Sequence, residues 1–133
     1  MTQKSFDLVR DARQKTLLVA HRGISGGNIP CNTIAAFDAA LADGADMIEL
    51  DVSRSLDGTL YVFHGGCELA HLGLCRPLTD LTDAEIRVLR YLNCDLGITE
   101  HPVYTFDDVL EHLKGRCYIN VDKFALYMQP ITE

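Results

Sequence analysis

The clearest alternation of apolar and polar positions runs through residues 46–52. Ile48, Leu50 and Val52 would share one side of a strand, which places Glu49 and Asp51 together on the other side. This pattern is typical either of a half-exposed strand with solvated acids or of a metal site. A helical pattern and an earlier strand-like run precede it, which indicates a βαβ unit with a parallel sheet. Because parallel strands are usually covered on both faces, the two acids would need a compensating cation.

Three other short apolar runs have the length of strands, and each leads into polar residues. They are residues 17–20, followed by His21 and Arg22, residues 60–63, followed by His64, and residues 117–123, with Asn120 and Asp122 on one face. Ligands bind at the carboxyl ends of the strands in open and closed α/β sheets. These polar residues are therefore expected to meet at one edge of the sheet, although a His-Arg pair alone could equally serve as a cap or salt bridge.

Amphipathic helices are expected between these strands. The clearest follows Asn32 as its N-cap, with Ile34, Phe37 and Leu41 as the buried stripe and Gly44 at the end. A short helix over residues 5–14 would be capped by Ser5, with Phe6, Val9 and Ala12 on one face.

Two later helices carry stronger start signals. Thr82 and Glu85 form a capping box, which opens a helix with Ile86, Leu89 and Leu92 inside. Thr105 caps a helix that is ended by Gly115, and its core-facing residues are Phe106, Val109, Leu110 and Leu113.

Residues 65–79 lack periodicity and are predicted to form a loop. Cys67, His71 and Cys75 are spaced by four residues, which would align them on a helix as possible zinc ligands. No Cys-x-x-Cys spacing accompanies them and no fourth ligand is evident, which argues against zinc.

Composition limits the classes of function. The chain has 133 residues, 47% hydrophobic residues and a formal net charge of −7. That size suits one domain, and the acidic balance argues against nucleic-acid binding. No apolar run approaches the roughly 18 to 20 residues of a membrane span, and the N-terminus lacks the apolar core of a signal peptide. Five widely spaced cysteines indicate free thiols, so a cytoplasmic location is expected.

The residues at the strand ends together indicate phosphoryl chemistry. Glu49, Asp51 and Asp122 offer hard oxygen ligands, which suit Mg²⁺ or Ca²⁺. His21 and His64 can exchange protons near neutral pH, and the residues leave open which would act as acid and which as base. Arg22 has the planar fork that matches a phosphate group.

The ordered set of motifs resembles the N-terminal half of the glycerophosphodiester phosphodiesterases. The resemblance covers roughly residues 17–123 and rests on His21-Arg22-Gly23, Asn32-Thr33, Gly44-Ala45-Asp46, residues 48–52, Asp57-Gly58, His64 and residues 103–123. It implies a TIM-type (β/α)₈ barrel, with residues 65–102 as an insertion-like loop and helix region of a single domain over residues 1–133.

The resemblance also implies a reaction and the residues that perform it. A glycerophosphodiester would be cleaved to glycerol 3-phosphate and an alcohol, with Mg²⁺ or Ca²⁺ at Glu49, Asp51 and Asp122. The two histidines, His21 and His64, would be general acid and base, and Arg22 would bind phosphate.

The chain departs from the family pattern at several positions. Cys31 stands where a Glu is usual before Asn-Thr, Gly65 replaces the usual Asp, and Asp122 replaces the commoner Glu. The family lysine lies two residues beyond that acid, where this chain has Phe124. Lys123 is adjacent, and strand alternation would turn its side chain to the other face.

Length is the largest departure, because a complete barrel takes ~250 residues. Half a barrel would leave two open sheet edges. Three interpretations follow: a fragment of a longer enzyme, a truncated product that binds metal or phosphate without turnover, or a half barrel completed by a second copy as a homo-oligomer. A related phospholipase of the same barrel superfamily is a fourth possibility.

Overall fold

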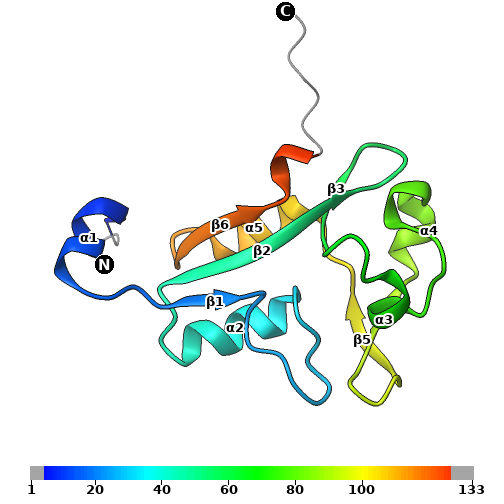
Figure 1. Ribbon diagram of the computed structural model, residues 1–133, viewed down its shortest axis with the longest axis horizontal. Coiled ribbons are helices and arrows are strands. Elements are labelled where there is room, and N and C mark those ends of the chain that lie inside the picture. Colours follow the sequence, from blue (N-terminus) through cyan, green and yellow to red (C-terminus); the bar gives the residue numbers. More distant parts are fainter. Residues whose placement is uncertain (1–4, 127–133) are drawn as a thin grey trace, which may run out of the picture.

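A parallel sheet lies at the centre of the computed structural model, which describes residues 5–126. Its three parallel strands are β1 (Val19–His21), β2 (Met47–Arg54) and β6 (Tyr118–Asp122). β2 lies between the other two (Figure 1). All three strands therefore end at the same edge, as the βαβ pattern predicts. The architecture is α/β and corresponds to part of a TIM-type barrel, with no closed barrel formed by the described residues.

β3 (Leu60–Val62) pairs antiparallel with the distal half of β2, because the chain turns back at Gly58. The pairing continues one residue beyond the strand, where the Phe63 N–H donates to the Asp51 carbonyl at 3.0 Å. This hairpin returns His64 to the level of Asp51. The return of β3 thus brings His64 to the carboxyl ends of the parallel strands.

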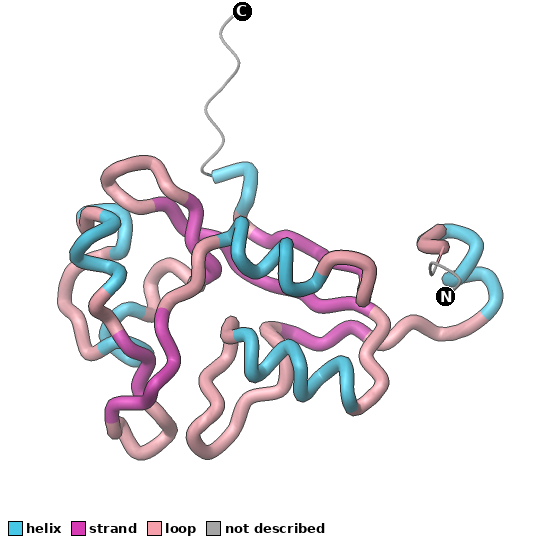
Figure 2. The backbone as a smooth tube through the Cα atoms, turned by 180° about the vertical axis from the view of Figure 1, so that it is seen from behind, coloured by secondary structure: helices cyan, strands magenta, loops and turns pink. Residues whose placement is uncertain are grey.

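Two helices cover one face of the sheet (Figure 2). α2 (Ile34–Ala42) and α5 (Phe106–Leu113) contribute Phe37, Ala40, Val109 and Leu113 to a core cluster, and β2 contributes Ile48, Leu50 and Val52. Since strand side chains alternate, Glu49 and Asp51 project from the opposite face. The predicted division of β2 into an apolar and an acidic face is confirmed.

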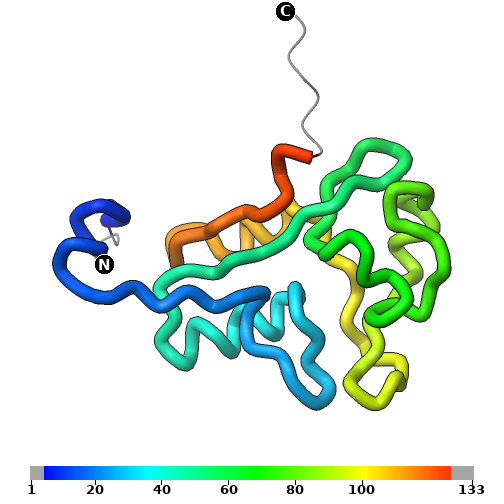
Figure 3. Tube along the Cα trace, in the orientation of Figure 1, coloured from blue at the N-terminus to red at the C-terminus, as the bar shows by residue number. Residues whose placement is uncertain are grey.

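A second core lies beyond the distal end of β2, formed by the segment between β3 and α5 (Figure 3). Its elements are α3 (Glu68–Leu72), a 3₁₀ turn at Leu78–Asp80, α4 (Asp83–Arg87), β4 (Arg90–Leu92) and β5 (Ile98–Pro102). Phe63, Leu78, Ile86 and Tyr91 are fully buried in it. These elements fall within residues 65–102, whose assignment as an insertion stays a prediction.

Several sequence-based predictions for this segment need correction. Residues 65–79 are not all loop, because they include helix α3. The helix has only five residues, which is too short to produce a detectable periodic pattern. Leu92 belongs to β4 rather than to the preceding helix, which ends at Arg87. The capping box of Thr82 and Glu85 is confirmed.

Two predicted N-caps are wrong. α1 (Leu8–Gln14) is capped by Asp7, whose carboxylate accepts from the Arg10 N–H at 3.0 Å, and not by Ser5. α2 is capped by Thr33 rather than Asn32, because the Asn32 side chain is committed to the functional site. Thr105 is confirmed as the N-cap of α5, and Gly44 follows α2 with φ +97°.

The chain leaves β6 through a 3₁₀ turn at Phe124–Leu126. Within residues 5–126, no helix has the length and apolar character required to cross a bilayer.

Candidate functional site

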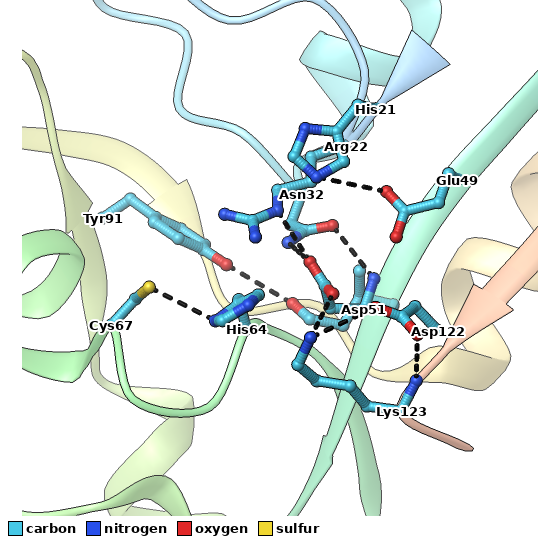
Figure 4. A network of polar contacts seen from close by, with 11 residues as sticks. His21, Arg22, Asn32, Glu49, Asp51, His64, Cys67, Tyr91, Asp122 and Lys123 are labelled. Carbon is cyan, nitrogen blue, oxygen red and sulfur yellow. Dashed lines mark hydrogen bonds and ion pairs between the residues drawn. The ribbon is translucent and has the colours of Figure 1, made fainter. Parts of the chain in front are cut away.

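Three carboxylates converge where the parallel pairing of β2 with β6 ends (Figure 4). The parallel register places Asp51 opposite Asp122. Glu49 lies two residues before Asp51 on β2, so its side chain is on the same face of the sheet. Each of the three can offer an oxygen, and these oxygens all lie within 4.8 Å of one another. The sequence-predicted acidic residues are therefore brought together by strand register.

One carboxylate oxygen of Glu49 is buried without a hydrogen-bond donor. This oxygen, Oε2, accepts no hydrogen bond, and it forms a long ion pair with His21 Nε2 at 3.8 Å. Burial, and then the neighbouring Asp51 charge, raise the pKa of Glu49. A buried carboxylate oxygen that accepts no hydrogen bond is costly, and a cation would relieve that cost. This oxygen and the all-oxygen donor set fit Mg²⁺ or Ca²⁺.

Asp51 is the buried anchor of the site, with 1% of its side chain exposed. Its Oδ2 accepts from Asn32 Nδ2 at 3.0 Å and forms an ion pair with Arg22 Nε at 2.9 Å. The Arg22 Nε–H is not aligned for a hydrogen bond, so that contact is electrostatic. Lys123 Nζ lies 3.5 Å from Oδ1. Asp51 therefore organises three side chains from three different segments.

Lys123 reaches the acids through a backbone change at the end of β6. Its φ is +62°, so the alternation that would turn it away no longer applies after Asp122. Lys123 Nζ donates to Asp122 Oδ2 at 3.1 Å, and this hydrogen bond lowers the pKa of Asp122. The expected turn of Lys123 to the other face is thus wrong.

His21 and Arg22 sit where β1 ends and the chain enters a tight loop. Arg22 has φ +59°, and its N–H donates to the Glu49 carbonyl at 2.8 Å. Gly23 follows with φ +81°, and a Cβ there would lie 2.6 Å from the backbone carbon of Ala36. Only glycine fits this approach of the loop to α2. The His21 side chain is 72% exposed beside Glu49.

His64 approaches the same region from the end of β3. Its Nδ1 lies 3.3 Å from Cys67 Sγ, and the rest of the ring is turned toward Asp51 and Lys123 (Figure 4). The sequence-predicted residues His21, Arg22, His64, Glu49, Asp51 and Asp122 thus all belong to one region of the molecule.

The possible zinc ligands do not come together. Among residues 5–126, the acidic triad is the only group of three or more ligating side chains close enough to hold an ion. The His71 ring instead packs against Phe63 and Tyr91, with centroid distances of 6.3 Å to each. Cys31, at the position of the family Glu, is partly buried, and this burial raises the pKa of its thiol.

Besides Lys123, two residues of the site were not identified from the sequence. The residue type of Asn32 favours a helix cap, but its position beside Thr33 in the Asn-Thr motif is a signal for a second role. The signal for Cys67 was its place three residues after His64, which is the separation that a tight turn closes.

The fold and the site define a protein class: a partial TIM-type α/β barrel with acidic and basic side chains at the carboxyl ends of its strands. Comparison with known proteins narrows that class. The model of the glycerophosphoryl diester phosphodiesterase family matches residues 21–129, and the chain belongs to this family.

Similar proteins agree with this assignment. A glycerophosphodiester phosphodiesterase of Caldanaerobacter subterraneus subsp. tengcongensis is 60% identical over 50 residues, which are 38% of this chain and 20% of the relative. The crystal structure of a glycerophosphodiester phosphodiesterase from Agrobacterium tumefaciens has 36% identity and a TM-score of 0.70, over 80% of this chain and 46% of that one. The enzyme of that name from Thermotoga maritima gives 30% identity and a TM-score of 0.64, over 80% and 43%. The chain therefore spans less than half the length of these solved relatives.

Proposed function

We propose that this chain carries the metal- and phosphate-binding half of a phosphodiesterase site, which hydrolyses a glycerophosphodiester to glycerol 3-phosphate and an alcohol. The observation that carries the proposal is the acidic triad Glu49, Asp51 and Asp122, with oxygens within 4.8 Å of one another, bordered by His21, Arg22 and His64.

The acids would hold Mg²⁺ or Ca²⁺, and Glu49 Oε2, which accepts no hydrogen bond, would become a ligand of the ion. A bound divalent cation supplies positive charge next to the phosphate oxygens as negative charge develops on them. Arg22 would add a second positive group. Its Nε is paired with Asp51, which orients the guanidinium, and its terminal amino groups would bind phosphate oxygens.

Proton transfer would fall to the two histidines. Phosphodiester hydrolysis needs one group to deprotonate water and another to protonate the leaving alkoxide. His21 and His64 reach the acids from different strands, β1 and β3, and can therefore serve opposite sides of a bound phosphate. The small-molecule phosphodiester would thus lie between them, over the carboxylates.

The test measures glycerol 3-phosphate released from a glycerophosphodiester, with Mg²⁺ or Ca²⁺ and with a chelator. We expect release that requires the metal and that falls at least about 100-fold in His64→Ala and His21→Ala, because general acid–base groups contribute roughly that much or more. His101→Ala, in β5, is the matched control and is expected to retain activity.

Two results would contradict the proposal. Release that survives chelation and the loss of both histidines would place the chemistry elsewhere. No release, combined with metal-dependent stabilisation, would reduce the site to a binding remnant.

A further inference from the structure

The turn between β3 and α3 brings a thiol against the ring of His64. The Cys67 N–H donates to the His64 carbonyl at 3.1 Å, and Gly66 within the turn has φ +95°. This geometry places Cys67 Sγ 3.3 Å from His64 Nδ1, within hydrogen-bonding distance for sulfur. The contact is thus built into the local backbone.

A buried carboxylate holds this turn in place. Glu68 is 7% exposed, and its two oxygens accept from the Gly66 N–H at 2.8 Å and the Leu78 N–H at 3.0 Å. These hydrogen bonds link Gly66, the residue before Cys67, to Leu78, which lies ten residues after Glu68. Cys67 itself packs against the second core cluster. The sulfur therefore has a fixed position.

The backbone before His64 is also fixed. Phe63 is fully buried, and the hydroxyl of the buried Tyr91 donates to the Val62 carbonyl at 3.3 Å. Both the imidazole and its sulfur partner are thus attached to rigid parts of the second core.

We propose that Cys67 is the positioning residue of His64, accepting a hydrogen bond from Nδ1–H so that protons are exchanged only at Nε2. This inference rests on the proposed function, in which His64 transfers a proton. A histidine that cycles between neutral and charged forms at Nε2 keeps Nδ1–H in both states, and the acceptor for that N–H decides the tautomer. Nε2 lies on the ring edge turned toward Asp51 and Lys123 (Figure 4).

The proton balance holds for either catalytic role of His64. As base, Nε2 takes a proton from water while the oxygen–phosphorus bond forms, and as acid it returns a proton to the alkoxide while the other oxygen–phosphorus bond breaks. The Nδ1–H group keeps its hydrogen bond to the Cys67 sulfur throughout. Cys67 itself neither gains nor loses a proton.

The first test reads the tautomer by ¹⁵N NMR of the full chain at a pH of about 8.5, where an ordinary imidazole is neutral. We expect wild-type His64 to show the Nδ1–H form. Cys67→Ala should shift His64 toward the Nε2–H form, and Cys67→Ser, which keeps an acceptor, should restore Nδ1–H. Cys75→Ala, at an exposed cysteine of the same segment, is the matched control and should match wild type.

The outcomes separate this inference from the proposed function. An Nε2–H tautomer in wild type, or identical His64 spectra in wild type and Cys67→Ala, would overturn the role of Cys67 whether or not the chain hydrolyses phosphodiesters. Where turnover is measured, Cys67→Ala should lose roughly tenfold in kcat with KM unchanged, and Cys67→Ser should recover most of it. Failure of all variants, wild type included, to release glycerol 3-phosphate would count against the function and leave the spectroscopic result standing.

Discussion

Asp51 on β2 and Asp122 on β6 occupy facing positions of a parallel strand pair, yet their environments differ sharply. The Asp51 side chain is 1% exposed and the Asp122 side chain is 53% exposed. A cation between them would be held by one rigid and one solvent-accessible carboxylate. Glu49 adds a third oxygen, Oε2, which is buried and accepts no hydrogen bond.

Divalent cations are therefore expected to stabilise the fold. A ligand that binds only the folded state at 100 times its Kd adds about 2.7 kcal/mol to the free energy of unfolding, so Mg²⁺ or Ca²⁺ should raise Tm measurably. Glu49→Gln should remove most of this effect. Glu111→Gln, at an exposed acid of α5, serves as the control in the same thermal melts. Equal responses of Glu49→Gln and wild type would rule out Glu49 as a ligand.

Asn32 is expected to be important for stability as well as for the site. It is 1% exposed, has φ +58° and bonds Asp51 through its side-chain amide. Asn32→Ala loses a hydrogen bond to a charged group and strains the left-handed backbone, for a total of about 3 kcal/mol. Asn32→Gly relieves the backbone strain but does not restore the hydrogen bond. Its free energy of unfolding, measured by urea denaturation, should therefore lie between those of Asn32→Ala and wild type. A Gly variant as unstable as Ala would show that the φ angle contributes little.

The acidic strand could be predicted because its evidence is local. Period-2 alternation determines which residues share a face, so Glu49 and Asp51 were paired correctly, and the βαβ pattern placed them beside β1. Asn32 could not be resolved in the same way. Its left-handed conformation and its bond to Asp51 depend on a residue 19 positions away, whereas its residue type alone favours an N-cap.

β4 and β5 pair antiparallel as a separate two-stranded sheet that the sequence did not predict, and the wrong orientation of Lys123 has a related cause. β4 has only three residues, so it carries no strand signal that outweighs the helical pattern of residues 82–92. β5 is also short, and it ends in Pro102, which weakens its strand signal. The buried Tyr91 stabilises β4 by tertiary packing. The orientation of Lys123 depended on β6 ending at Asp122, and strand ends are not marked by alternation.

Gly23 and Gly27 provide a matched pair within one loop. Both have positive φ, but a Cβ at Gly23 would lie 2.6 Å from the Ala36 backbone, whereas one at Gly27 meets nothing within 4 Å. Gly27→Ala should therefore cost about 1 kcal/mol from backbone strain alone. Gly23→Ala should cost about 3 kcal/mol, because α2 must also move. Denaturant midpoints of the two variants check this difference, and similar values would contradict the close approach.

Asp83 is expected to give the fold a dependence on acid pH. Hydrogen bonds from Ser55, Thr59 and Tyr61 lower the pKa of its carboxyl in the folded protein, whereas burial and Asp83 raise the pKa of Tyr61 to about 12. The Asp83 contribution is therefore present above the unfolded pKa near 3.8 and is lost as the pH falls through the lower folded value.

Asp83→Asn tests this contribution directly. The variant should lose about 1 kcal/mol at neutral pH, because the half-buried side chain loses the charge that strengthens its hydrogen bonds from Thr59 and Tyr61, and the difference from wild type should shrink as the pH falls below 3.8. Urea melts at neutral and acid pH measure it, with Asp95→Asn, in the β4–β5 turn, as control. A difference that does not change with pH would assign the effect to packing rather than to charge.

The two outer strands of the sheet are expected to promote self-association. Within residues 5–126, β1 and β6 each pair only with β2, and Leu18 and Val19 beside the free edge of β1 are 56% and 52% exposed. Unpaired edges with apolar side chains favour pairing between chains, and a lysine at such an edge opposes it. Val19→Lys should therefore weaken association by roughly tenfold, equivalent to about 1.4 kcal/mol.

Sedimentation velocity over a concentration series distinguishes this edge from general surface hydrophobicity. Val88→Lys removes an equally apolar side chain, 76% exposed at the end of α4 and outside the sheet, and should leave the association constant unchanged. Equal effects of the two substitutions would show that exposed apolar surface, rather than strand pairing, drives association. A monomer at every concentration would show that the edge of β1 does not recruit a second chain, because the self-association expected from an open edge would be absent.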